Sequence, residues 1–262
     1  MSMDVRSLIA ASTAQERRLE VLANNLANVN TVGFKARRPV FSLLPLADGT
    51  AGQAAPVQLA FLGESALPEG AERLQFGLGL QMTGVKTNFE AGDILMTGNP
   101  LDLALSTPGF FVIQTPQGLR FTRNGSFTLN SEKVLVNQDG YPVMGQRGPI
   151  TVEGNRVMVE QSGKLTVDGR EADALRVVDF KNRDRALRKD LGGLFINAPG
   201  IEPQDPGRVE VRSGALERSN VSPVPSLTEM VEVLRAFEAY NKVIQTLNEA
   251  TQRATTEVGR LR

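Results

Sequence analysis

The fold is decided by the stretch SLTEMVEVLRAFEAYNKVIQTLNEATQRATTEVGRL, residues 226–261. Steps of three and four residues through it meet apolar or aromatic side chains at Met230, Val233, Phe237, Tyr240, Ile244, Leu247, Ala254, Val258 and Leu261, with Thr251 as the exception. This repeat lines one narrow side of a helix and favours a long partner helix over the core of a globular domain, which is the competing interpretation. We predict a helix of about 50 Å. Pro223 and Pro225 should stop it from extending backwards, and Ser226 with Glu229 matches a capping box.

A second narrow apolar stripe of this kind, which we call a seam, lies near the N-terminal end of the chain, in residues 4–29. Its stepped positions are Val5, Leu8, Ser12, Gln15, Leu19, Leu22, Leu26 and Val29. We predict that the two helices pair with each other, or with the same helices of neighbouring copies, as a discontinuous helical domain. The fold class is therefore α+β, with discontinuous N- and C-terminal coiled-coil helices and an inserted, mostly antiparallel β domain.

Four asparagines crowd the end of the first helix, in ANNLANVNTVGFKA, residues 23–36. Asparagine is a poor helix former but suits helix ends and turns, because its amide bonds to backbone groups. Gly33 would supply a C-terminal stop. The residues alone leave two interpretations open: a fraying helix end, or a polar seam that forms hydrogen bonds with another chain.

Composition divides the rest of the chain. The predicted parts are the N-terminal helix with the asparagine-rich stretch, residues 1–36; an extended arm or linker, 37–82; a β-rich domain, 83–222; and the C-terminal helix, 223–262. Prolines and weak periodicity mark the arm. Short strands with closely spaced turns indicate an antiparallel sandwich or barrel-like domain. Asn124-Gly125 and Asp139-Gly140 are hairpin signals, because both central residues of such turns take positive φ.

The composition also excludes several kinds of site. The 262 residues include 29 basic and 29 acidic side chains but no Cys, His or Trp, so cysteine and histidine nucleophiles, imidazole bases and Cys/His metal sites are excluded. The balanced charge argues against a nucleic-acid partner. Glu90, Asp93, Asp102 and Asp139 stand in turn-like contexts, where a structural role is favoured over acid–base catalysis. We expect no enzyme and no cofactor.

The N-terminal stretch does not have the pattern of a secretory signal. Asp4 and Arg6 interrupt residues 1–14, which contain no continuous apolar core. No run approaches the length of a transmembrane helix. We therefore expect a chain without a cleaved signal peptide that leaves the cytosol, if at all, by another route.

Three groups of motifs, taken in order, resemble the family of flagellar rod and hook proteins. They are the asparagine-rich residues 23–36; NPLDLAL (99–105), PGFFVIQ (108–114), FTRNGSF (121–127) and DGYPVMG (139–145); and GALERSNV (214–221) with RAFEAYNKVIQT (235–246). The resemblance implies a structural subunit of the bacterial flagellar basal-body rod, exported unfolded by the flagellar export apparatus and assembled in the periplasm. It implies that the terminal helices line the axial channel with the β domain outside them. The implied partners are other rod proteins and copies of the chain, with no nucleic acid and no small-molecule substrate.

Two types of this family fit the length, the proximal-rod FlgF type and the distal-rod FlgG type. Gly148-Pro-Ile150 and the stretch FEAYNK (237–242) resemble the FlgF type more, and Leu234 stands where the FlgG type usually has Gln. We favour the FlgF type and keep the FlgG type as the alternative.

The seams and the resemblance together nominate residues for contacts between subunits. They are Leu8, Leu19, Leu22, Asn24, Asn25, Leu26, Asn28, Gly33, Phe34, Asn220, Met230, Leu234, Phe237, Tyr240, Ile244 and Leu247. A membrane-surface module is a further alternative, because Arg6, Arg17 and Arg18 make the first helix partly basic. Acidic neighbours such as Glu16 and Glu20 offset that charge and favour a solvated or subunit-facing surface.

Overall fold

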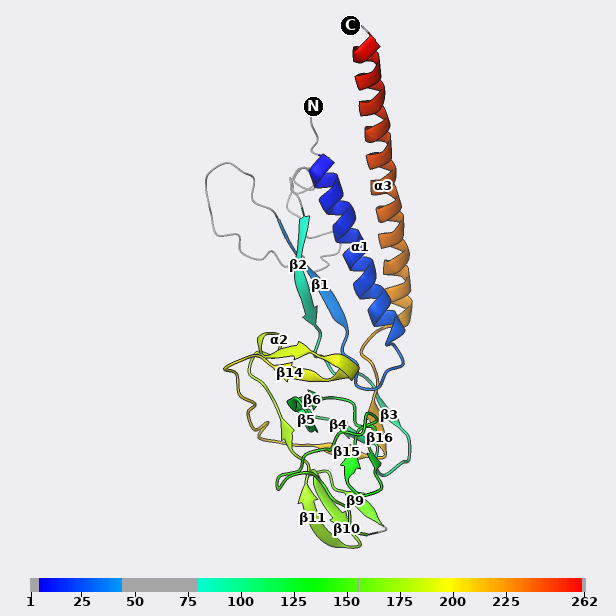
Figure 1. The fold of residues 1–262 in the computed structure, drawn as a ribbon. Coiled ribbons are helices and arrows are strands. Elements are labelled where there is room, and N and C mark those ends of the chain that lie inside the picture. Colours follow the sequence, from blue (N-terminus) through cyan, green and yellow to red (C-terminus); the bar gives the residue numbers. More distant parts are fainter. Residues whose placement is uncertain (1–4, 44–79, 155, 261–262) are drawn as a thin grey trace, which may run out of the picture. The chain divides into compact units, whose positions relative to one another are not determined.

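The computed structural model describes residues 5–43, 80–154 and 156–260, which form two units. The helical unit comprises residues 1–26, 37–86 and 223–262, and the β unit comprises residues 27–36 and 87–222. Both are drawn in Figure 1. Residues 27–36, which we expected to belong with the helices, group with the β unit because their contacts are made there.

The helical unit contains two long helices that lie side by side, α1 (Val5–Ala27) and α3 (Pro223–Arg260) (Figure 1). Two polar contacts join them: Ser12 Oγ donates to Asn241 Oδ1 at 3.2 Å, and Arg18 Nη2 donates to Glu229 Oε1 at 2.6 Å. From the first contact to the second, the residue number rises along α1 and falls along α3. The two helices therefore run antiparallel. Both predicted helices are present.

The predicted start of the C-terminal helix is wrong. α3 begins at Pro223, and both Pro223 and Pro225 lie in its first turn. The N–H groups of a first turn have no partner within the helix, so a proline there removes nothing, and its fixed φ suits the helix. Ser226 is therefore inside the helix, and the Glu229 carboxylate bonds Arg18.

Part of the predicted arm is a pair of strands. β1 (Arg37–Leu43) and β2 (Leu80–Thr87) form a two-stranded sheet, and Thr83 Oγ1 donates to the carbonyl of Val40 at 3.2 Å. The rest of the predicted arm, residues 44–79, lies outside the described residues.

The β unit is built from short strands, and its strand pairs are antiparallel. Its elements are β3 (Ile94–Met96), β4 (Leu103–Leu105), β5 (Phe110–Thr115), β6 (Gly118–Thr122), β7 (Thr128–Leu129), β8 (Leu135–Val136), β9 (Val157–Val159), β10 (Lys164–Val167), β11 (Arg170–Ala174), β12 (Val177–Val178), α2 (Arg183–Ala186), β13 (Leu187–Lys189), the 3-10 helix η2 (Leu191–Gly193), β14 (Phe195–Asn197), β15 (Val211–Ser213) and β16 (Ala215–Glu217). The largest sheet has the order β12-β5-β6-β14-β13, and a three-stranded sheet has the order β11-β10-β9. Two-stranded pairs, including β15-β4 and β16-β3, complete the unit.

Alternating side chains of β5 divide the core into two clusters. Phe111 and Ile113 face a larger aliphatic cluster that includes Leu135 and Leu165. Phe110 and Val112 face a second cluster, rich in phenylalanine. Edge-to-face ring pairs such as Phe110 with Phe195, whose centroids are 5.8 Å apart, hold the second cluster together. One strand, buried except at Gln114, therefore contributes to both clusters.

The hairpin predicted at Asn124-Gly125 is also wrong, because neither residue has a positive φ. Gly125 instead lies against β4, where its carbonyl accepts the N–H of Leu103 at 3.0 Å. A Cβ at Gly125 would collide with the Leu103 carbonyl, so glycine is required here for close backbone approach. The turn predicted at Asp139-Gly140 is present, with a positive φ, 83°, at Gly140 alone.

The close approach at Gly125 gives a testable stability effect. Gly125→Ala should lower the free energy of unfolding by about 2 kcal/mol or more, because the backbone of β4 must move to admit the methyl group. Urea unfolding followed by circular dichroism measures the loss. Gly84→Ala is the matched control, since no atom lies within 4 Å of its built Cβ, and it should change stability by less than about 0.5 kcal/mol. Equal effects of the two substitutions would contradict this account.

Candidate functional site

Three charged side chains from distant parts of the sequence meet inside the β unit. Lys35 comes from the asparagine-rich stretch, Arg123 directly follows β6, and Glu217 ends β16. Lys35 Nζ lies 2.6 Å from Glu217 Oε1, and Arg123 Nη1 lies 3.1 Å from Glu217 Oε2. Each cation therefore binds one oxygen of the same carboxylate. We call these three residues the ion cluster.

The ion cluster is almost fully buried. The side chains of Lys35 and Glu217 are each 1% exposed, and that of Arg123 is 5% exposed. Lys35 also donates to the carbonyl of Glu90 at 2.6 Å, Glu217 accepts the N–H of Gly92 at 2.9 Å, and Arg123 donates to two backbone carbonyls. Partners of this kind are what make a buried ion pair tolerable, because they replace most of the lost contacts with water; Arg123 Nε is the buried polar atom of the cluster without a hydrogen-bond partner.

Burial also lowers the pKa values of the two cations in the cluster. Loss of contact with water lowers the pKa of the Lys35 ammonium, although the Glu217 carboxylate opposes that shift. The pKa of the Arg123 guanidinium is lowered for the same reason. With both cations charged, two positive groups share one negative group, so Glu217 is the member on which the others depend.

The backbone of the asparagine-rich stretch docks onto the same place. Gly33 donates its N–H to the carbonyl of Glu217 at 2.7 Å. Its φ is +66°, and a Cβ there would collide with the backbone of Arg123 and Asn124, so only glycine fits. α1 ends at Ala27, well before Gly33, so the predicted role of Gly33 as the stop of that helix is wrong.

Two more of the nominated residues, Phe34 and Asn220, help to hold the asparagine-rich stretch in the β unit. Phe34 is 4% exposed, and Lys189 Nζ lies 3.7 Å from the centroid of its ring, in a cation–π contact. Asn220 Oδ1 accepts the N–H of Ala36 at 2.7 Å, and its Nδ2 donates to the carbonyls of Asn88 and Glu90. The structure thus gathers Gly33, Phe34 and Asn220 around the ion cluster.

The asparagines of the stretch also bond within the chain. Asn25 is 6% exposed; its Nδ2 donates to the carbonyl of Arg37 at 2.7 Å and its Oδ1 accepts the N–H of Arg37 at 2.8 Å. Asn28 Oδ1 accepts a hydrogen bond from Thr31 Oγ1 at 3.2 Å. Asn24 is exposed on α1.

The nominated apolar residues of the helices are mostly half-buried. On α3 these are Met230, Leu234, Phe237, Tyr240, Ile244 and Leu247. On α1, Leu22 is buried and Leu19 and Leu26 are half-buried, whereas the side chain of Leu8 lies outside the described residues. Val233, 2% exposed, is the most deeply buried apolar residue described on α3.

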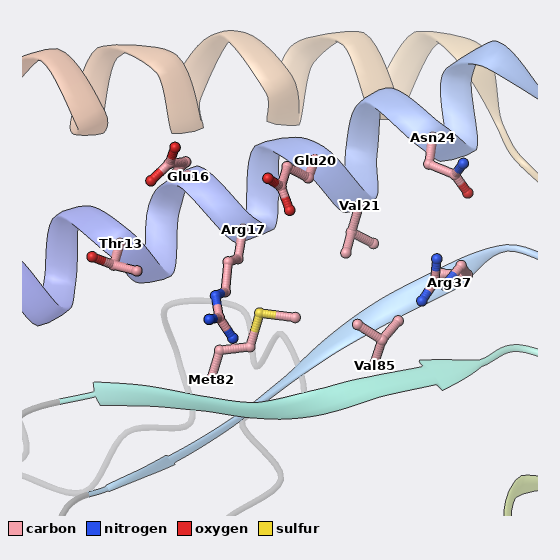
Figure 2. Close-up of a pocket in the computed structure, with 9 residues that line it drawn as sticks. All are labelled: Thr13, Glu16, Arg17, Glu20, Val21, Asn24, Arg37, Met82 and Val85. Carbon is pink, nitrogen blue, oxygen red and sulfur yellow. The ribbon is translucent and has the colours of Figure 1, made fainter.

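A groove of about 650 Å³ runs between α1 and the β1–β2 pair (Figure 2). It is lined by Thr13, Glu16, Arg17, Glu20, Val21, Asn24, Arg37, Met82 and Val85. Its charges are mixed, two acids against two arginines, and we assign no chemistry to it. Among residues 5–43, 80–154 and 156–260, no three acidic side chains gather as metal ligands, and no helix has the length and apolarity needed to cross a bilayer.

The shared carboxylate predicts unequal effects of two substitutions. Glu217→Gln should lower the free energy of unfolding by about 3–5 kcal/mol, because it leaves two buried cations without a counter-charge. Lys35→Met should cost less, since Arg123 and Glu217 still neutralise each other. Chemical denaturation of both variants measures the difference.

The control for this prediction is the exposed pair of Lys164 and Glu171, whose side chains are 48% and 52% exposed. Glu171→Gln should change stability by less than about 1 kcal/mol. If Lys35→Met proved as damaging as Glu217→Gln, the carboxylate would not be the shared centre of the cluster.

Comparison with known proteins agrees with this architecture. Residues 6–35 match the family "Flagella basal body rod protein", residues 104–167 match "Flagellar hook protein FlgE/F/G D1 domain", and residues 212–257 match "Flagellar basal body rod FlgEFG protein C-terminal". The ion cluster takes Lys35 from the first matched region, Arg123 from the second and Glu217 from the third.

Relatives of two names match over nearly the whole chain. The flagellar basal-body rod protein FlgF of Caulobacter vibrioides is 32% identical over 94% of this chain and 93% of its own length. The flagellar basal-body rod protein FlgG of Agrobacterium fabrum is 34% identical over 94% of this chain and 96% of its own length. The FlgG of Caulobacter vibrioides is 32% identical over 97% of this chain and 98% of its own length. The chain therefore belongs to the FlgF/FlgG family of flagellar basal-body rod proteins, which are structural components of the flagellar basal body.

Proposed function

We propose that this chain is a proximal-rod subunit of the FlgF type that polymerises through its terminal helices. The observation that carries the proposal is the distribution of apolar side chains around α3. Val233 is buried, whereas Val224, Leu227 and Val231 are 72%, 45% and 46% exposed. These three follow each other at intervals of three and four residues, and at about 100° per residue their stripe lies opposite Val233.

A helix with apolar side chains on opposite sides needs more than one partner. α1 is one, through the contacts of Ser12 and Arg18. Among the described residues, the opposite stripe remains largely open to solvent. A neighbouring subunit that covers Val224, Leu227 and Val231 would remove that apolar surface from water, at roughly 25 cal/mol per Å².

The unequal lengths of α1 and α3 also favour contacts of α3 with other subunits. α3 has 38 residues and α1 has 23. Counting from the contact of Ser12 with Asn241, the start of α1 is level with roughly residue 248 of α3 at 1.5 Å per residue. The last turns of α3 therefore extend past the described part of α1 (Figure 1). Helices of other subunits are the natural partners of this extension.

In this proposal the nominated helix residues serve two kinds of contact, the pairing of α1 with α3 and the contacts between subunits. They are Leu8, Leu19, Leu22, Leu26, Met230, Leu234, Phe237, Tyr240, Ile244 and Leu247. Each subunit offers different surfaces to successive neighbours, so contacts do not close and a rod results. The assembled helices would line the export channel and transmit torque. The chain would reach the periplasm through the flagellar export apparatus, without a cleaved signal peptide.

The position in the rod is the finer part of the proposal. Leu234 and the stretch FEAYNK favour the FlgF type, whereas relatives named FlgF and FlgG match with similar identity and coverage, which keeps the distal-rod FlgG type as the second candidate. Electron microscopy of basal bodies from cells that lack the chain separates them. A rod that ends near its base supports the FlgF type, and a rod that ends further out supports the FlgG type.

The exposed stripe on α3 gives a direct test of assembly. Val231→Lys should reduce the amount of the chain in isolated rods at least about tenfold, because a buried ammonium replaces an apolar contact. It should leave the unfolding of the free chain unchanged, since Val231 is exposed there. Immunoblotting of purified basal bodies measures incorporation.

Ala239→Lys is the matched control. It introduces the same charge at an exposed position of α3 that lies off the stripe. Normal incorporation of Val231→Lys, or equal loss with Ala239→Lys, would refute the proposed contact.

A further inference from the structure

The β unit carries an open strand edge at β3. β3 pairs with β16 and with no other strand of the described residues. The N–H of Arg218 bonds the carbonyl of Asp93, and the N–H of Thr97 bonds the carbonyl of Gly214, each at 2.8 Å. Because bonded and non-bonded positions alternate in an antiparallel pair, the backbone N–H and C=O groups of the intervening even-numbered residues, 94 and 96, point away from β16.

This edge is apolar and firmly held. Leu95 and Met96 are 51% and 68% exposed, and β3 contains no charged residue. At its start, Gly92 donates its N–H to the buried Glu217 carboxylate. The edge is therefore preformed rather than ordered only when a partner arrives.

Two other edges of the β unit are protected by charge. β13, at the edge of the five-stranded sheet, carries Arg188 and Lys189, and β11, at the edge of the three-stranded sheet, carries Arg170 and Glu171. Charged side chains on an edge strand discourage pairing with another molecule. β3 lacks this protection, which indicates that pairing there is not selected against.

β9 combines a lack of charge with a strongly exposed apolar side chain, as β3 does. β9 forms the second edge of the three-stranded sheet, pairs only with β10 among the described strands and contains no charged residue. Its central residue, Met158, is 61% exposed. The three most exposed large apolar side chains described in the β unit, Met96, Met158 and Leu95, thus lie on β3 and β9.

We propose that β3 of one copy of this chain pairs edge to edge with β9 of the next copy. The pairing joins backbone groups that each strand leaves open and removes the two protruding methionines from water. It uses two different surfaces, so it is a head-to-tail contact that can repeat along a polymer. This inference rests on the self-assembly proposed above and adds a contact through the β unit.

The absence of cysteine from the chain allows a site-specific test. Rods would be isolated from cells whose only copy is Met96→Cys/Met158→Cys and treated with a short bis-maleimide, which tolerates small shifts in register. In strands paired in this way, residues 96 and 158 lie at most about one position apart in register, roughly 8 Å or less, within its reach. A ladder of crosslinked chains is expected, at least about tenfold stronger than with either single variant, with residues 96 and 158 of different copies linked in peptide mapping.

Leu129→Cys/Met158→Cys is the matched control, because Leu129 is 37% exposed on β7, which is neither of the two strands proposed to pair. Loss of the Met96 variant from rods that accept the Leu129 variant would also support the contact. The proposal is overturned if no ladder forms, if the Leu129 pair gives an equal ladder, or if position 96 links to itself or to another rod protein. Incorporation of the unaltered chain, measured in parent cells that carry only that chain, tests the proposed function separately.

Discussion

The β unit depends on one carboxylate that two buried cations share. Glu217 binds Lys35 and Arg123 through different oxygens, accepts the N–H of Gly92, and receives the N–H of Gly33 on its backbone carbonyl. A buried pair stabilises little relative to an apolar core, but breaking it is costly. The cluster is therefore best understood as a device for specificity, because it fixes which segments meet at this point.

The segments that meet at the cluster explain its place in the architecture. Lys35 lies shortly after α1, and Glu217 lies shortly before α3. Two segments of the β unit that adjoin the helices in sequence, residues 27–36 and the end of residues 87–222, are thus held together by the same group of side chains. Gly33, which fits only because it lacks a Cβ, and Asn220, which bonds the backbone on both sides, belong to the same anchorage. Residues 27–36, the second part of the asparagine-rich stretch, act within the β unit as a docked turn.

The sequence predicted those features that depend on periodicity and failed where distant segments meet. The step of three and four residues identified both helices, but Pro223 could not be placed, because proline both excludes a helix interior and suits a first turn. Alternation and turn residues located β5, β6 and β10, yet Asn124-Gly125 misled, because a glycine required for close approach resembles one required for a turn. β1 and β2 were missed. They pair with each other, but a long connection of low periodicity separates them in the sequence.

The ion cluster was invisible for a related reason. Lys35, Arg123 and Glu217 each occur within a motif that indicated the family, but nothing local marks them as partners. Only the opposite charges of Glu217 and the two cations offered a signal, and other charged residues, such as Arg37 and Arg218, stand close to them in the sequence. The second apolar face of α3 was also missed in the sequence. Its stripe is short, because it consists of Val224, Leu227 and Val231 at the start of the helix.

The separation of Lys35 and Glu217, 182 residues, has a consequence for how the chain acquires its structure. Closing a loop of that length costs about 5 kcal/mol of chain entropy, from (3/2)RT ln n. Such a contact belongs late in a folding pathway, after local hairpins such as β5–β6 have formed. Until the C-terminal fifth of the chain has folded back onto the β unit, Lys35 has no counter-charge, so the first and last segments of the β unit become fixed to each other only at the end of folding.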